Sequence, residues 1–192
     1  MKHFFEWGAG VVLVGVLILA LSQIAASPVH NPGVTTADDP VVWTGTHTNT
    51  SQPCFLAFNS VTDTDVTGAG AIATIDFDTE VFDQGADFVA DTFTASVTGK
   101  YLLQVTVSVG GVTAAADRMD LDLVTSNRTY SSVWVHTDTL PTTIERTLVA
   151  IADMDALDTA FARLQGTGEA SNVQDINGSS VLLTYFSGCL IS

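Results

Sequence analysis

Residues 91–109 read DTFTASVTGKYLLQVTVSV, and this stretch decides the fold. In its second half, apolar side chains occupy alternate positions, and from residue 104 onward the positions between them are polar. The apolar series is Tyr101, Leu103, Val105, Val107 and Val109, and the polar series is Gln104, Thr106 and Ser108. A period of two is typical of a strand that buries one face. The stretch therefore predicts a half-buried β-strand over residues 101–109.

The next part of the chain predicts a β-hairpin. Residues 119–124 (MDLDLV) alternate again, Asn127 and Arg128 are suited to a turn, and residues 129–136 (TYSSVWVH) supply the returning strand. The two aspartates of MDLDLV are expected to face water. From Phe55 onward, short runs of β-branched and aromatic residues are separated by Gly, Asn and Asp, and no helix is expected after residue 27.

Two later runs are apolar on both faces. They are residues 147–154 (TLVAIADM) and residues 181–186 (VLLTYF). A strand of a two-layer sandwich meets the core with only one face, so its second apolar face needs another surface. The simplest such surface is a symmetry-related copy, and the pattern predicts oligomerisation.

Three segments in order carry a resemblance to a known family. FDTEVFDQGADF begins at Phe77, DTFTASVTGKYLLQVTV follows, and SVLLTYFSGCLI begins at Ser180. Together they resemble the globular head of the complement C1q and tumour-necrosis-factor type, in a prokaryotic or viral member. The matching residues are Phe93, Thr94, Ala95, Gly99, Tyr101, Phe186, Ser187, Gly188 and Leu190. The chain departs from the family where Ser96 replaces Pro and Cys189 replaces an aromatic, and no Gly-X-Y collagen stalk is present.

The resemblance implies an all-β fold, a two-sheet antiparallel jelly-roll sandwich over residues 54–192. It also implies a homotrimer, and it places the first and last strands side by side. Cys54 would then lie near Cys189, and a disulfide that locks the two ends of the domain is the favoured hypothesis. Two free buried thiols are the alternative.

The chain before the sandwich divides into two parts. Residues 7–26 are almost uninterruptedly apolar and long enough to span a membrane, so residues 1–27 are expected to be a membrane anchor or signal helix. Residues 28–53 are rich in Thr, Pro, Asn and Asp and predict an extended polar stalk. The folded domain is expected outside a cell or virion membrane, or secreted if the segment is cleaved.

The charge balance argues against some partners. The formal net charge is −15, from 21 acidic residues against 6 Lys and Arg. Such a chain repels polyanions, so nucleic acid is excluded as a partner. A strongly hydrated acidic surface is typical of a salty medium, and a halophilic source is the hypothesis.

No catalytic motif is present, so an enzyme is not expected and no cofactor is required. Calcium remains possible at two weak oxygen-rich sets, although solvated acidic turns are the favoured interpretation. The sets are Asp63, Asp65 and Thr67, and Asp153, Asp155 and Asp158.

A few exposed features are candidates for contact with other molecules. Asn49, Asn127 and Asn177 each begin an N-x-S/T glycosylation sequon. Trp134 and Tyr130 could contact a ligand near a strand end, or could belong to the sandwich core.

These features favour a surface-displayed trimeric recognition module, a spike or fibre-tip knob that binds an extracellular glycan or protein receptor through avidity. The alternative is a purely structural trimeric component of an envelope or capsid. A hydrolase on a jelly-roll scaffold is the third class, since a fold does not fix a function.

Overall fold

The computed structural model describes residues 52–136 and 142–192. Thirteen strands and no helix form within these residues. The described residues accordingly include no helix that could cross a membrane. The expected anchor at 1–27, nearly all of the stalk at 28–53, and Asn49 lie outside the described residues.

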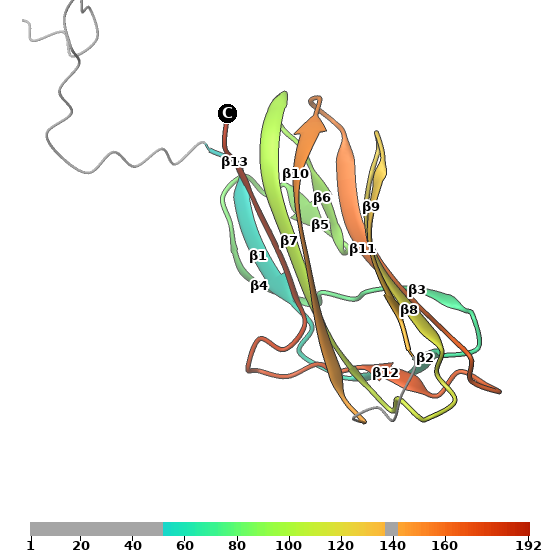
Figure 1. The fold of residues 1–192 in the computed structure, drawn as a ribbon. Coiled ribbons are helices and arrows are strands. Elements are labelled where there is room, and N and C mark those ends of the chain that lie inside the picture. Colours follow the sequence, from blue (N-terminus) through green and yellow to red (C-terminus); the bar gives the residue numbers. More distant parts are fainter. Residues whose placement is uncertain (1–51, 137–141) are drawn as a thin grey trace, which may run out of the picture. The chain divides into compact units, whose positions relative to one another are not determined.

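The strands form two antiparallel sheets, which are layered face to face in Figure 1. Sheet A has the order β2 (Asp63–Thr67), β12 (Gln174–Ile176), β7 (Gly99–Gly110), β13 (Tyr185–Leu190), β1 (Cys54–Phe58) and β4 (Thr79–Asp83), and β10 (Ile144–Met154) also pairs with β7. Sheet B has the order β5 (Phe88–Val89), β6 (Thr92–Thr94), β11 (Thr159–Thr167), β8 (Arg118–Thr125) and β9 (Thr129–Val135), and β3 (Ile72–Thr74) pairs with β11. The expected all-β, two-sheet antiparallel sandwich is confirmed.

The second half of the stretch that decides the fold becomes β7, the central strand of sheet A, and its first half contains β6 of sheet B. The five predicted apolar side chains of β7, from Tyr101 to Val109, are fully buried. The opposite face differs from the expectation, because Thr106 and Ser108 are also buried. The Thr106 hydroxyl forms a hydrogen bond with the hydroxyl of Thr147. The Ser108 hydroxyl accepts a hydrogen bond from Asn177 Nδ2 at 3.1 Å.

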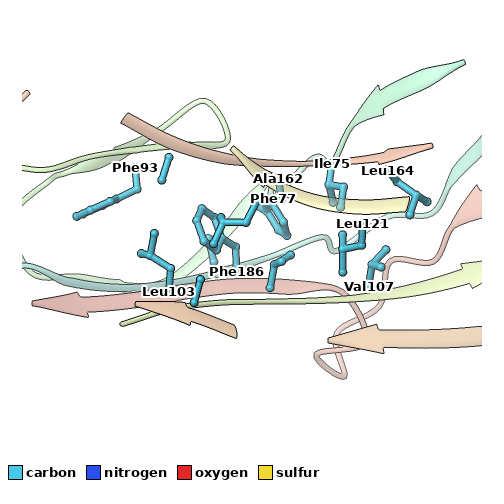
Figure 2. Close-up of a cluster of buried hydrophobic side chains, with 14 of the residues drawn as sticks. Ile75, Phe77, Phe93, Leu103, Val107, Leu121, Ala162, Leu164 and Phe186 are labelled. Carbon is cyan, nitrogen blue, oxygen red and sulfur yellow. The ribbon is translucent and has the colours of Figure 1, made fainter. Parts of the chain in front are cut away.

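The core lies between the two sheets and is rich in phenylalanine (Figure 2). Phe55 stacks on Phe88 and Phe93 with ring centroids 4.9 and 4.7 Å apart, and its ring meets Phe186 edge-on. Offset stacking and edge contacts are the favourable aromatic geometries, and they add to the stabilisation from burial itself. This aromatic cluster joins strands β1, β5, β6 and β13 across both layers.

The predicted hairpin is confirmed. β8 pairs with β9 from Arg118↔Val135 to Val124↔Thr129, and Asn127 lies in the connecting turn. The aspartates Asp120 and Asp122 point away from the core but are only 17% and 15% exposed, because each pairs with an arginine.

The predicted strand at residues 181–186 is wrong in its position. β13 begins only at Tyr185, and Val181 and Leu182 lie in the preceding loop with 69% and 39% exposure. The reason is that β12 and β13 share one edge of β7. β12 occupies Val109 and Gly110, so β13 pairs only from Thr106 to Tyr101.

The first and last strands are neighbours, as the resemblance implied. β1 pairs with β13 from Phe58↔Tyr185 to Cys54↔Cys189. The two cysteines form a disulfide in the structure, with Cα atoms 4.1 Å apart. Beyond the pair, Leu190 N donates to Pro53 O at 3.0 Å, so the chain enters and leaves the sandwich at the same end.

Candidate functional site

The outward face of sheet A is built by four adjacent strands in matched register. Its three rows, each running across β1, β13, β7 and β10, are Cys54–Cys189–Leu102–Ile151, Leu56–Ser187–Gln104–Val149 and Phe58–Tyr185–Thr106–Thr147. None of these twelve residues is charged. We call these twelve residues the neutral face.

The neutral face exposes large apolar side chains. Leu102, Val149 and Ile151 are 42%, 53% and 58% exposed. Phe82 of β4 extends the second row beside Leu56 and is 42% exposed. The expectation that residues 147–154 are apolar on both faces is confirmed, and within the described chain nothing covers the outward one.

Charged residues lie around the border of the neutral face, including exposed Glu80 on β4, two residues from Phe82. The next register position on one side pairs Lys100 with Asp153, and on the other side it pairs Glu145 with Ser108. In a chain of net charge −15, these twelve residues form a patch that carries no charge of its own.

Polar atoms in the neutral face bond to one another. Gln104 Nε2 donates to Tyr185 Oη at 2.9 Å, and the Thr106 and Thr147 hydroxyls are 2.9 Å apart. Covering a polar group costs free energy unless it keeps a hydrogen bond. These internal bonds lower the cost of removing the face from water.

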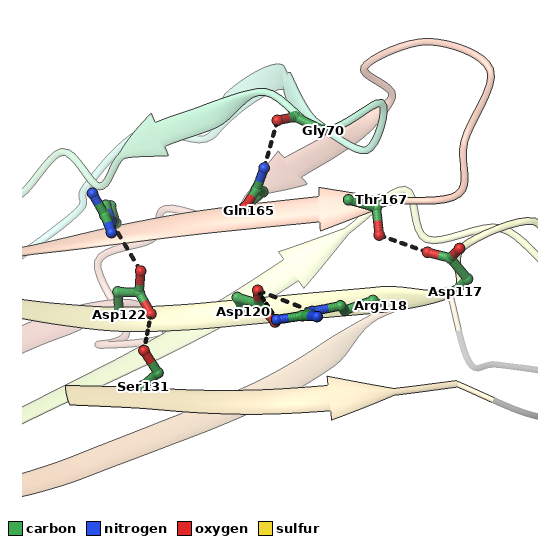
Figure 3. Close-up of polar contacts among 9 residues, drawn as sticks. Gly70, Asp117, Arg118, Asp120, Asp122, Ser131, Gln165 and Thr167 are labelled. Atoms are coloured by element: carbon green, nitrogen blue, oxygen red, sulfur yellow. Dashed lines mark hydrogen bonds and ion pairs between the residues drawn. The ribbon is translucent and has the colours of Figure 1, made fainter. Parts of the chain in front are cut away.

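The outward face of sheet B has the opposite character (Figure 3). Arg118 contacts Asp120 at 2.7 Å on β8, and Arg163 of β11 contacts Asp122 at 2.9 Å. Ser131 of β9 also donates to Asp122. Its charges compensate one another and remain partly hydrated, so this face is suited to water.

Trp134 and Tyr130 lie at the side of the sandwich between edge strands β9 and β10. Both pack against the core and are half-buried. The guanidinium of Arg146, on β10, lies 4.4 Å from the centre of the Trp134 ring, a cation–π contact that joins the two sheets. The two aromatic rings therefore make internal contacts.

Solved structures with a similar chain path share this architecture. The globular domain of zebrafish complement 1qA protein aligns with 73% of this chain and 98% of its own, at 17% identity and a TM-score of 0.51. Murine APRIL aligns with 73% of this chain and 99% of its own, at 10% identity and a TM-score of 0.50. The domain has the C1q/TNF-like fold. No known family profile and no curated protein sequence matches the chain.

In this C1q/TNF-like domain the first calcium candidate is not a loop. Asp63, Asp65 and Thr67 form β2, and the Thr67 hydroxyl is buried, donating to Ala71 O at 2.5 Å and accepting from Gly166 N at 2.8 Å. The expectation of a solvated loop at these residues was wrong, because β12 pairs with them.

The second calcium candidate is partly a turn. Asp153 lies in β10, one residue before its end. The Asp158 carboxylate accepts hydrogen bonds from Asp155 N at 2.9 Å and from Asn127 Nδ2 at 2.7 Å. These bonds hold the turn beside the β8–β9 hairpin. Within residues 52–136 and 142–192, no group of three or more His, Cys, Asp or Glu side chains is placed to hold a metal ion.

The two sequons within the described residues differ in setting. Asn127 is exposed but its amide donates to Asp158 and to Asp153 O. Asn177 is half-buried and its amide donates to Ser108. Glycosylation at either site would require its amide to leave these bonds.

Sequence reasoning missed an acidic cluster near the β3–β4 connection of the C1q/TNF-like domain. Partial desolvation of the carboxyl group, followed by the charge of Asp91 and a hydrogen bond to it, raises the pKa of Asp76 to about 6, with further contributions from Asp63 and Asp78. The side chain of Asp76 is otherwise exposed. The cluster consists of Asp63, Asp76, Asp78 and Asp91. Their positions in the sequence are the only signal of it, and the fold is what brings them together.

Proposed function

We propose that this domain assembles as a homotrimer through the neutral face and works as a surface-displayed recognition module for an extracellular glycan or protein receptor. The observation that carries the proposal is the neutral face itself. A chain of net charge −15 has a charge-free, partly apolar surface across four strands.

Charge supports a second copy as the occupant of this surface. Identical chains repel each other through their acidic surfaces, so close contact is least unfavourable where neither surface carries charge. A partner of opposite charge would instead be expected to meet acidic residues. In a trimer the neutral faces would therefore surround the threefold axis, with one side of each face against the other side of the next copy's face.

The dimensions agree with the core of a subunit contact. Strands about 4.8 Å apart and rows about 7 Å apart give a patch of roughly 20 Å by 20 Å with its side chains. This is roughly half of the about 800 Å² that each partner of a standard interface buries. Interfaces commonly have an apolar centre and a polar rim, and Lys100, Asp153 and Glu145 would lie in that rim.

Three copies rather than two follow from the likeness to the C1q and tumour-necrosis-factor type, whose heads are trimer-forming. Three copies, each with its own anchor and stalk, would present three sites together and raise a weak single-site affinity through avidity. The absence of a catalytic motif from the sequence supports binding over catalysis. Display from a cell or virion membrane rests on the apolar segment at residues 7–26.

The test is sedimentation of the full chain in a density-matched mild detergent. Wild type is expected at three times the chain mass. Val149→Asp introduces a charge into the neutral face and is expected to yield monomers, because three buried carboxylates would lack partners. The matched control is Val133→Asp, on the outward face of sheet B, where the valine is 50% exposed against 53% for Val149.

A monomeric wild type would contradict the assembly, and equal effects of the two substitutions would contradict the choice of face. Trimers that bind neither a glycan array nor cells would instead favour the structural alternative, an envelope or capsid component.

A further inference from the structure

The Cys54–Cys189 disulfide lies within the neutral face. Cys54 is opposite Cys189, Cys189 is opposite Leu102, and Leu102 is opposite Ile151, so the four side chains form one row on one side of sheet A. Both cysteines are half-buried. Neighbouring strands are about 4.8 Å apart, so the bridge lies about 5 to 10 Å from these exposed apolar side chains.

A subunit seated on the neutral face would cover this bridge. A contact of standard size, about 800 Å² per partner, is roughly 30 Å across, and one centred between Gln104 and Val149 extends beyond Cys54. Reduction of a disulfide begins with attack of a thiolate on one sulfur atom, so the thiolate must reach that atom. The covering subunit would block this approach.

The bridge also fixes the strands that carry the face. It joins β1 to β13 across a sequence separation of 135 residues, and these strands supply half of the four-strand face. β1 has only β13 and β4 as hydrogen-bonded neighbours in sheet A. Without the bridge, no covalent bond holds β1 beside β13. The β1 residues of the first two rows, Cys54 and Leu56, would then be held in register by hydrogen bonds and packing alone.

Building on the proposed function, we propose that the Cys54–Cys189 disulfide is a redox-sensitive part of the subunit contact. Assembly protects the bridge from thiols, and reduction of the bridge weakens assembly. At equilibrium, a reduction that weakens assembly also makes the bridge of the assembled protein harder to reduce, by the same factor. Separately, the covering subunit slows reduction by blocking the attacking thiolate. With dithiothreitol as reductant, the S–S bond takes up two electrons and two protons to give two thiols, and dithiothreitol closes to its cyclic disulfide.

The test compares rates of reduction by dithiothreitol in the full chain under the same detergent. Free thiols are alkylated at intervals and counted by mass spectrometry, and the mass of each sample is measured by sedimentation. Assembled wild type and Val133→Asp are expected to be reduced at least about tenfold more slowly than Val149→Asp, because the covering subunit blocks the attacking thiolate. Wild type diluted until it dissociates is expected to lose its protection, which separates shielding from any loss of folding in the variant.

Equal rates in assembled and dissociated wild type would overturn the inference while leaving the trimer intact. A wild type that never assembles would overturn both it and the proposed function. In the reciprocal measurement, fully reduced wild type is expected to dissociate at a concentration at least about tenfold higher than the oxidised protein. An unchanged dissociation concentration would contradict the linkage.

Discussion

Asp76 and Asp91 bring two carboxyl groups into hydrogen-bonding contact, and Asp91 also accepts from Phe77 N at 2.7 Å. With its pKa raised to about 6, folded Asp76 holds a proton that the unfolded chain releases near pH 3.8. Stability from this site is thus fully present below pH 3.8 and is lost as pH rises through 6. The ionised pair is a local weakness at neutral pH.

Asp76→Asn is expected to raise the melting temperature at pH 7 and to have little effect at pH 4, because asparagine keeps a donor for Asp91 without adding charge. Thermal unfolding from pH 4 to 8 measures this. Glu80→Gln removes the same charge from an exposed position on β4 and controls for net charge. A pH-independent gain for both variants would contradict the paired-carboxyl explanation.

The burial of single residues was only partly predictable from the sequence. The alternation from Tyr101 to Val109 identified the buried face of β7, because periodicity is a local property. The burial of Thr106 and Ser108 could not be read from it, since Thr147 and Asn177 cover them from distant positions. Gln174 is fully buried with neither amide atom hydrogen-bonded among the described residues, and no sequence signal pointed to it.

Among the elements, β13 fits between β1 and β7 because Gly188 leaves space for core side chains of both neighbours. An added Cβ at Gly188 would come 2.5 Å from Leu103 Cδ2 and 2.8 Å from Phe55 Cε1. The nearest neighbours of this position are core side chains and not backbone. Their rings and methyl groups occupy the space that the glycine leaves.

Gly188→Ala is expected to destabilise the domain by about 1–3 kcal/mol, because overpacking forces core side chains from their preferred rotamers. Urea unfolding monitored by fluorescence measures the change in free energy. Ser187→Ala alters the neighbouring residue on the opposite face of β13 and is expected to change stability by less than about 0.5 kcal/mol. A stabilised Gly188→Ala would show that the core relaxes around the methyl group.

The strand order of sheet A was only partly predictable. The adjacency of β1 and β13 came from the family resemblance, while the sharing of one β7 edge by β12 and β13 came from neither pattern nor resemblance. The β1–β13 pair and the pairs that β12 and β13 make with β7 join segments distant in sequence, and local strand propensity does not encode such pairings. One part of the neutral face was predictable, because the sequence of residues 147–154 indicated an outward apolar side on β10. The absence of charge across the face was not, because it depends on the register of four strands.

For the whole molecule, the proposed assembly would bring three chains of net charge −15 together. Salt screens this repulsion, since the Debye length falls from about 14 Å at 0.05 M to about 4 Å at 0.5 M. The dissociation concentration of the trimer is expected to fall about tenfold over that range, measured by sedimentation of the full chain. Weaker assembly in high salt would instead indicate that attractive ion pairs dominate the contact.

The hydrogen bond between Leu190 and Pro53 has a practical consequence for labelling. A fluorescent protein fused after Ser192 would emerge beside residue 52, at the end where the polypeptide enters the sandwich. The loop at residues 177–184, which precedes β13, lies at the other end of that strand and would stay unobstructed. A short epitope inserted there, near exposed Val181, would lie away from the fused protein, and antibody binding to intact cells would test the proposed surface display.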